Sequence, residues 1–478
     1  MKLFSNPEIS YLKLPNNFQW LRVLIIICLI VFSMAVSIIP SIEILWSILG
    51  LIGGIGGAVV VLRSPFLGLA VLIIGSFIIP FSIRTGTQTG LNFTVIVISG
   101  LIALWILRVI TQRCNLKIFF SGSEVALIAF AIVAVLAFIV GQISWFPSPG
   151  APIRTQLGGL AVFILSIGGF FLVSHQSREE RQLEWLVWIF VVLGAFYVCG
   201  LILPGIGRIT QVLVDPGATG TMFWVWLLAL TTSQFLFNRK LAFQWRILLA
   251  LLIIGILYVT MIQRTSWISG WLPPLIAFAA IFLLGTPRLA LFGTFFLVVI
   301  LFISEEWVSG YIMAGDNPYS LLTRQEAWEI ILKLLKKNPF LGFGPANYYF
   351  LTGMYPIRGW FVNFSSHNNY VDILAQTGIV GLSCFLWFAF EIGKLLLRLR
   401  NRFSEGFNRA YVYGAFGGLV GTLFAGMLGD WFLPFVYNVG LAGMRSSILP
   451  WLFLGGVLAL SRFSPVISER GEMLVKQS

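Results

Sequence analysis

The sequence consists largely of uninterrupted apolar segments, most of them about 17–21 residues long, that are separated by short polar stretches. Backbone polar groups inside a bilayer must be satisfied without water, so only α-helices and closed β-barrels cross it. Barrel strands are alternating segments of about ten residues, whereas a helix needs roughly 20 apolar residues to cross. The sequence therefore predicts an all-α, polytopic integral membrane protein in contact with the lipid bilayer.

Composition supports this fold class. Of the 478 residues, 58% are hydrophobic and 10% are charged, whereas soluble domains carry about 25% charged residues. We predict about fourteen transmembrane helices from these segments. Their approximate ranges are 21–40, 44–62, 66–83, 92–110, 124–143, 155–174, 183–203, 220–237, 246–263, 267–285, 288–304, 370–390, 410–428 and 446–461. Because further spans follow the first at once, we expect an uncleaved first helix and not a signal peptide.

The distribution of positive charge predicts the topology. If the N-terminus is cytoplasmic, roughly 21 of the 31 lysines and arginines face the cytoplasm, as the positive-inside rule expects. We therefore predict a bacterial inner-membrane protein with both termini in the cytoplasm. The net charge of +13 is then a topology signal, and it calls for no nucleic-acid partner.

One long segment interrupts the short loops. Residues 305–369 form an extracytoplasmic loop between an N-terminal membrane region, 1–304, of about eleven helices and a C-terminal one, 370–478, of about three. The loop contains an amphipathic helical pattern. Its apolar positions are Ala327, Ile330, Ile331, Leu334 and Leu335. This helix either lies in the headgroup plane or packs on the ends of other helices.

The chain has two histidines, and only one of them lies on the outer side. His367 is found where the long loop enters the span at 370–390, and an imidazole can accept a proton at neutral pH. The alternative is an ordinary loop histidine. His175 is in a cytoplasmic loop with charged neighbours, which predicts a solvated side chain.

A few arginines lie on the outer side apart from the long loop. They are Arg84, Arg154, Arg208, Arg264 and Arg445. Arg264 separates two long apolar segments, where it either snorkels to lipid phosphate or binds an anion. Two or three converging arginines would bind a diphosphate, because a guanidinium matches phosphate bidentately.

No metal site or cofactor is predicted. The sequence has no DxD pair, its outer acids lack metal-ligand spacing, and its four cysteines are scattered. Gly342-Phe343-Gly344-Pro345 is too short for a phosphate-binding loop and predicts a tight turn.

Several motifs around the long loop occur in a characteristic order. They are Arg324-Gln325-Glu326-Ala327-Trp328, the segment from Asn338 to Tyr348, His367-Asn368-Asn369-Tyr370, and the segment from Ala375 to Gly381. In order and spacing they resemble the O-antigen ligase and O-antigen polymerase superfamily of membrane glycosyltransferases. The resemblance implies a metal-independent enzyme that takes a saccharide from a polyprenyl-diphosphate carrier.

The resemblance also implies roles for single residues. His367 matches the loop histidine that engages the acceptor hydroxyl. Arg264 matches an outer arginine, although Gln263 stands where the family often has serine. Arg208 matches a further arginine less closely, because the helix start that follows it reads Asp215-Pro216-Gly217.

We therefore expect transfer of a lipid-linked saccharide to a glycan or lipid acceptor on the outer face. Arg264 and Arg208 would hold the diphosphate, and His367 would orient or deprotonate the acceptor hydroxyl. The expected substrate-binding residues are Arg324, Asn368, Tyr370 and Arg154. The aromatic residues Tyr348, Trp360 and Tyr370 either stack on sugars or anchor the protein at the interface.

Two other functions stay open. A polysaccharide flippase or exporter would also need many spans, but ion-coupled transporters usually bury acids or histidines near the midplane, and these spans hold almost none. A degenerate family member with a structural role is the other alternative. The sequence does not decide between ligase and polymerase.

Overall fold

The computed structural model describes residue 57 and residues 64–84, 90–111, 121–288 and 318–463. The chain divides into two compact units, Met1–Arg63 and Ser64–Ser478. Gly57 is the one described residue of the first unit, so the following account concerns the second. The predicted spans 21–40 and 44–62, and all but the first residue of 288–304, lie outside the described residues.

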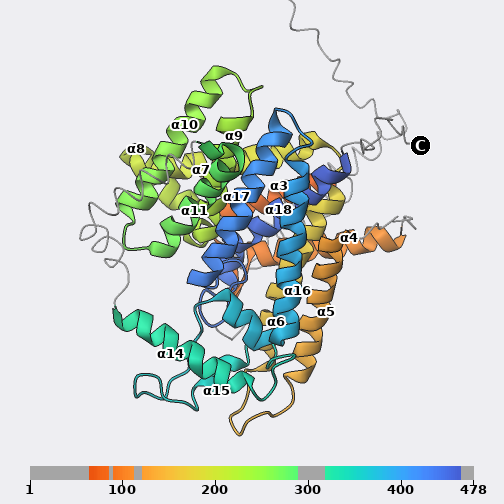
Figure 1. The fold of residues 1–478 in the computed structure, drawn as a ribbon, viewed down its shortest axis with the longest axis vertical. Helices are drawn as coiled ribbons and strands as arrows, with labels where there is room; N and C mark the ends of the chain where they lie inside the picture. The colour runs from red at the N-terminus through yellow and green to blue at the C-terminus, as the bar shows by residue number, and fades with distance from the viewer. Residues whose placement is uncertain (1–56, 58–63, 85–89, 112–120, 289–317, 464–478) are drawn as a thin grey trace, which may run out of the picture. The chain divides into compact units, whose positions relative to one another are not determined.

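The second unit is built mainly of helices (Figure 1). Nine helical segments within the described ranges are long and apolar enough to cross a membrane. Their main helices are α4 (Phe93–Thr111), α5 (Gly122–Val140), α6 (Ile153–Gln176), α7 (Glu180–Ile202), α10 (Phe243–Tyr258), α11 (Ile268–Gly285), α16 (Asn369–Leu399), α17 (Phe407–Leu428) and α18 (Met444–Phe463). The segment of α10 continues to Gln263, and that of α18 begins at Leu441. With the shorter apolar helices α3 (Pro65–Ile78) and α9 (Thr221–Phe237), they account for every predicted span that is described.

The total of about fourteen spans stays a prediction, as does the division into 1–304, 305–369 and 370–478. The all-α prediction needs one small correction. Strands β1 (Ser82–Arg84) and β2 (Gly90–Asn92) form an antiparallel hairpin with Ser82 opposite Asn92. The predicted span 66–83 ends early as α3, because a residue before proline disfavours helical dihedral angles and Ile79, before Pro80, is extended.

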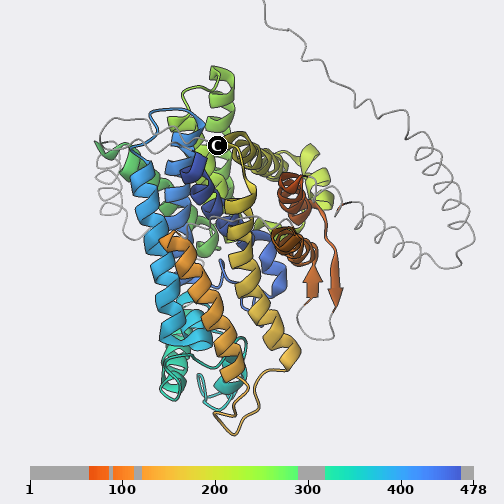
Figure 2. The same ribbon diagram turned by 90° about the vertical axis from the view of Figure 1, so that its right-hand side faces the viewer.

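The core of the unit lies around α9. This helix packs against α7, α10, α11, α17 and α18, and both Trp224 and Trp226 on it are fully buried. A helix that is apolar on all sides is expected inside a bundle. A second layer is formed by α6 packed on α18 and α5 packed on α16, and Figure 2 shows α5, α6 and α16 side by side.

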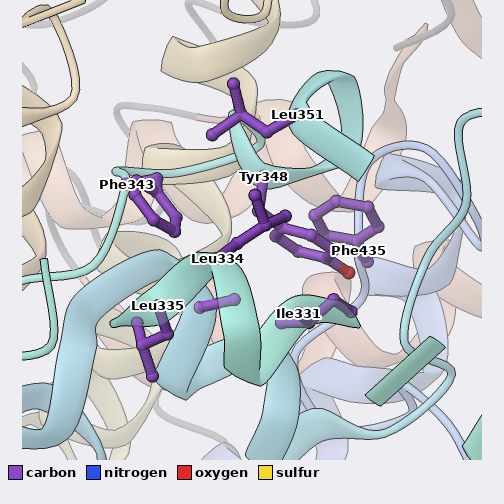
Figure 3. Packing of buried hydrophobic residues seen from close by; sticks show 8 residues of the cluster. Ile331, Leu334, Leu335, Phe343, Tyr348, Leu351 and Phe435 are labelled. Carbon is purple, nitrogen blue, oxygen red and sulfur yellow. The ribbon is translucent and has the colours of Figure 1, made fainter. Parts of the chain in front are cut away.

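The helices of the long loop, α14 (Pro318–Leu335) and α15 (Tyr348–Thr352), lie at one end of α5, α6 and α16 in both views (Figures 1 and 2). The apolar stripe of α14 faces protein. Ile331, Leu334 and Leu335 are buried in one cluster with Phe343, Tyr348, Leu351, Ala375 and Phe435 (Figure 3). The described contacts therefore favour packing on other helices over a position in the headgroup plane.

The segment after α14 docks onto a break in α16. At Gly378 the backbone has φ of +67° and ψ of −173°, which divides α16 into two helices. The exposed backbone groups at the break pair with the loop: Ile379 N donates to Pro339 O (2.8 Å) and Phe343 N donates to Ala375 O (2.9 Å). The predicted span 370–390 is therefore a helical span with a break at Gly378. This docking holds the start of α16, and the residues just before it, against the loop.

Candidate functional site

His367 lies at the centre of the site, two residues before α16. Its backbone is in the left-handed region, with φ of +50°. Side chains other than glycine rarely adopt this region, and such residues cluster at functional sites. His367 is partly exposed to solvent, whereas the adjacent Ser366 and Asn368 are buried.

Buried groups fix the backbone on the N-terminal side of His367. Trp328 Nε1 donates to Ser366 O (2.7 Å), and Ser366 N donates to the hydroxyl of Tyr348 (3.2 Å). Ser366 Oγ donates to Asp372 Oδ1 (2.7 Å), which also accepts from the Tyr348 hydroxyl. Burial, followed by the nearby Asp372 carboxylate, raises the pKa of Tyr348 well above 10, so the phenol keeps its proton.

Tyr348 is fully buried. It therefore does not stack on a sugar as one of our interpretations had it. Trp360, by contrast, is well exposed, so either interpretation of this residue remains open.

On the C-terminal side of His367, Asn368 caps α16. Its Oδ1 accepts from Tyr370 N (2.9 Å) and Val371 N (3.3 Å), and its Nδ2 donates to Met427 O (3.2 Å). The Tyr370 hydroxyl donates to Leu423 O (2.7 Å). Asn368 and Tyr370, both predicted to bind substrate, therefore also have structural contacts that fix the start of α16 to α17.

Two residues of the loop between α17 and α18 reach the imidazole. Asn438 Nδ2 lies 3.0 Å from His367 Nδ1 and 2.5 Å from Asp430 Oδ1. The Asp430 carboxylate is buried and accepts a second bond from Phe435 N (2.8 Å). Asp430, Asn438 and His367 thus form a connected row of side chains.

This row assigns the tautomer of His367. The Asn438 amide presents Nδ2, which only donates hydrogen bonds, to Asp430 Oδ1. The same Nδ2 contacts His367 Nδ1, which makes Nδ1 the acceptor. In the neutral imidazole the proton is then on Nε2.

The surroundings also set the charge of the imidazole. Loss of hydration lowers the pKa of His367 from 6.5; the nearby Asp430 acts in the opposite direction, and the positive charge of Arg324 lowers the pKa further. The imidazole is therefore neutral at pH 7. Arg324 and Trp328, one helical turn apart on α14, both act on the His367 loop.

Arg264 lies at the end of a π-helical turn, Val259–Gln263, that extends α10. Its guanidinium lies over the rings of Trp224 (5.5 Å) and Trp267 (6.0 Å), and Nη2 donates to the Tyr197 hydroxyl (3.1 Å). Trp267 in turn contacts Trp431, with ring centroids 6.1 Å apart. The loop that holds His367 through Asp430 therefore also contacts the aromatic support of Arg264.

The structure does not connect the other two predicted arginines to this site. Arg208 is exposed on α8 (Pro204–Leu213), and Arg154 is exposed in the first turn of α6. Among the described residues, neither forms a hydrogen bond or ion pair with His367 or Arg264. Their roles stay predictions.

Sequence reasoning missed the roles of Asp430 and Asn438. The position of Asp430 just after the end of α17, on the outer side of the predicted topology, was the available signal for it. Asn438 carried no such signal, because an exposed loop asparagine is unremarkable before its contacts are known.

The structure corrects His175 as well. It is not solvated, because its Nε2 lies 2.8 Å from the fully buried carboxylate of Glu124, which also pairs with Arg462 at 2.8 Å. Arg445, another of the arginines predicted on the outer side, is 3% exposed and holds α3 to α18. Its guanidinium donates to the carbonyls of Ser76, Ile79 and Phe81.

Comparison with known protein families gives one match. A family model described as O-antigen ligase matches residues 248–386. No curated protein matches the chain. The matched range includes Arg264, Arg324 and His367, and it confirms the superfamily that the sequence motifs resemble. Together with the apolar helices, it indicates a membrane protein with glycosyltransferase activity of the O-antigen ligase or polymerase type.

Proposed function

We propose that this chain, which carries the O-antigen ligase domain at residues 248–386, transfers a saccharide from a polyprenyl-diphosphate carrier to a hydroxyl of a glycan or lipid acceptor. The reaction takes place on the extracytoplasmic face of a bacterial inner membrane, with both termini in the cytoplasm. The observation that carries the proposal is the His367 loop, a partly exposed histidine on a left-handed backbone with its neighbours held by buried groups.

Arg264 binds the diphosphate of the donor in this proposal, with Arg208 as its second arginine. A guanidinium has five N–H donors, and Arg264 directs Nη2 at Tyr197 while Trp224 and Trp267 hold its plane. The remaining donors suit phosphate oxygens. Negative charge grows on the diphosphate as it leaves, so fixed donors there lower the barrier.

His367 orients the acceptor in this proposal. Nε2–H donates to the oxygen of the attacking hydroxyl and directs a lone pair at the anomeric carbon. A bond forms between that oxygen and the anomeric carbon while the bond from the anomeric carbon to the phosphate oxygen breaks. The diphosphate leaves with the electron pair, and the hydroxyl proton passes to it. The tautomer set by Asn438 supports orientation over proton abstraction.

Arg324 is the best placed of the other predicted substrate-binding residues, because its charge already acts on His367. Arg154, Asn368 and Tyr370 remain candidates for further contacts. Metal independence also remains part of the proposal.

Transfer is tested in proteoliposomes with lipid-linked saccharide and acceptor supplied on the outer face. We expect the parental protein to consume the donor, and His367→Ala to lose about 10²–10³-fold in rate. The matched control is Gln325→Ala, an exposed position in the same loop, which should keep the parental rate. Movement of donor across the bilayer without its consumption would instead support the exporter alternative.

The glycan profile of a deletion strain separates the two transferase types. Loss of long chains with intact single lipid-linked units indicates a polymerase. Accumulation of full-length lipid-linked polymer indicates a ligase.

A further inference from the structure

A cavity of about 330 Å³ lies next to the His367 site and is not used by the mechanism above. It is bounded by the β1–β2 hairpin, the turn at Asp215 and the segment that leads into α18. The side chains that matter here are Ser82, Asp215, Tyr437, Asn438, Ala442 and Arg445.

One wall of the cavity leads to His367. Asn438 lines the cavity, and its amide lies 3.0 Å from His367 Nδ1. A molecule in the cavity is therefore one side chain away from the imidazole.

Another part of the cavity lining is linked to Arg264. Asp215 lines the cavity and caps the turn Pro216–Thr219 by accepting from Gly217 N (2.8 Å). Thr219 Oγ1 donates to the Tyr197 hydroxyl (3.3 Å), and this hydroxyl accepts from Arg264 (3.1 Å). The cavity thus adjoins the elements that hold both proposed reaction partners, the diphosphate side and the hydroxyl side.

The lining of the cavity suits a polyhydroxylated molecule. Asn438 directs Nδ2 at Asp430 and His367, so its carbonyl oxygen is left to accept a hydroxyl proton. The Asp215 carboxylate contacts Gly217 and Arg445 and has further lone pairs that can accept hydrogen bonds from hydroxyls. Ser82 is exposed, so its hydroxyl can also bind a sugar. A few such polar groups beside an aromatic ring, here Tyr437, are typical of small-molecule sites.

A phosphate is a poorer fit for the same cavity. Arg445 pairs with Asp215 at 3.5 Å, which leaves little net positive charge. Its guanidinium also donates to backbone carbonyls, and the nearest of these is the carbonyl of Ile79, at 2.7 Å. The groups at hand therefore favour sugar hydroxyls over an anion.

We propose that the cavity beside Asn438 is a saccharide subsite, which holds the sugar residues next to the reacting bond. The inference rests on the proposed function and names the substrate class of the same site. A saccharide held there keeps its anomeric carbon near the imidazole while its diphosphate extends toward Arg264.

Photo-crosslinking in cells tests the subsite independently of turnover. Ala442 is exposed in the cavity lining, so Ala442→p-benzoylphenylalanine places the reactive group inside. The matched control is Val212→p-benzoylphenylalanine on α8, which is 80% exposed and does not line the cavity. Both are made in His367→Ala, so that the cell's own lipid-linked saccharide stays unreacted. We expect a sugar-containing adduct at position 442 at least ten-fold above position 212 by mass spectrometry.

The adduct should disappear in a strain that makes no lipid-linked saccharide. Equal adducts at positions 442 and 212, or adducts carrying lipid alone, would overturn the subsite. If either occurs while the parental protein still transfers saccharide, the proposed function stands without the subsite. A specific adduct from a parental protein that transfers nothing would leave a saccharide-binding cavity and remove the proposed function.

A substitution that fills the cavity gives a second readout. Ala442→Trp should raise the KM for the lipid-linked saccharide by about ten-fold, while Val212→Trp leaves it unchanged. An unchanged KM in a stably expressed Ala442→Trp protein would also count against the subsite.

Discussion

Replacement of His367 by glutamine separates hydrogen-bond donation from base catalysis. Glutamine keeps an N–H donor but has no nitrogen that accepts a proton near neutral pH. The row from Asp430 through Asn438 places the imidazole proton on Nε2, so donation is the function to preserve. We therefore expect His367→Gln to stay within about ten-fold of the parental rate, because a small change in one hydrogen bond costs about 0.5–1.5 kcal/mol.

The alanine variant calibrates this comparison. It removes the donor altogether, and the loss of one donor directed at the reacting oxygens costs about 10²–10³-fold in kcat. A positioned base also contributes about 10²–10⁴-fold, so alanine alone does not separate the two roles. The ratio of the glutamine rate to the alanine rate does.

The assay is a single turnover of lipid-linked saccharide in proteoliposomes, with equal amounts of folded protein confirmed by size-exclusion chromatography. Single-turnover conditions separate the transfer step from product release. If His367→Gln is as slow as His367→Ala while both bind the donor normally, His367 takes up the hydroxyl proton. The tautomer assignment would then be wrong for the substrate-bound protein.

Two further predictions concern the same site, and a third concerns the break in α16. Arg324→Gln removes the positive charge that lowers the pKa of His367. On acidification, this variant should lose activity at a higher pH than the parental protein. A pH–rate profile whose acid limb does not move would contradict this. Arg264→Lys keeps the charge but loses the planar fork, and we expect a loss of about 1.5–3 kcal/mol, ten- to hundred-fold in rate; parental activity would remove Arg264 from the diphosphate site. Gly378→Ala should lower the unfolding free energy by about 1–3 kcal/mol, because its Cβ would meet the Phe340 carbonyl at φ of +67°. In thermal unfolding, Gly393→Ala on the same helix is the control, since its nearest neighbour is Leu419 Cδ2 at 3.9 Å.

The sign of the pH prediction follows from the cause of the shift. A positive charge near an imidazole disfavours the protonated form, so removal of Arg324 raises the pKa of His367. Protonation of Nδ1 places a donor against the donating amide of Asn438, and the row to Asp430 is then broken. Activity should therefore fall as the pH drops through the pKa of His367, and this fall should begin at a higher pH in Arg324→Gln.

The helices could be predicted from sequence because length and apolarity alone specify a membrane span. Each predicted span in the described residues coincides with a helix. The break at Gly378 could not be predicted in this way, because length and average apolarity over the segment 370–390 do not register a change of backbone conformation at one glycine. The break depends on loop residues far back in the chain, whose carbonyls at Pro339 and Phe340 pair with Ile379 and Val380.

Part of the candidate site could also be predicted from the sequence. His367 and Arg264 stood out because polar residues at the ends of apolar segments are rare and costly. The partners of His367 did not stand out, because Asn438 is 71 residues away in sequence and meets the imidazole only through the packing of the loop between α17 and α18. Local sequence patterns carry no information about a contact of that separation.

Asp372 shows how an isolated acid at a span end acquires a role without touching substrate. In the sequence it is the one acidic residue within the predicted span 370–390. In the structure it is 1% exposed and accepts from both Tyr348 and Ser366. These two groups also hold the backbone next to His367, since Ser366 N donates to the Tyr348 hydroxyl. The buried carboxylate therefore maintains the left-handed backbone at His367, and the imidazole is partly exposed with its direction already fixed before any substrate binds.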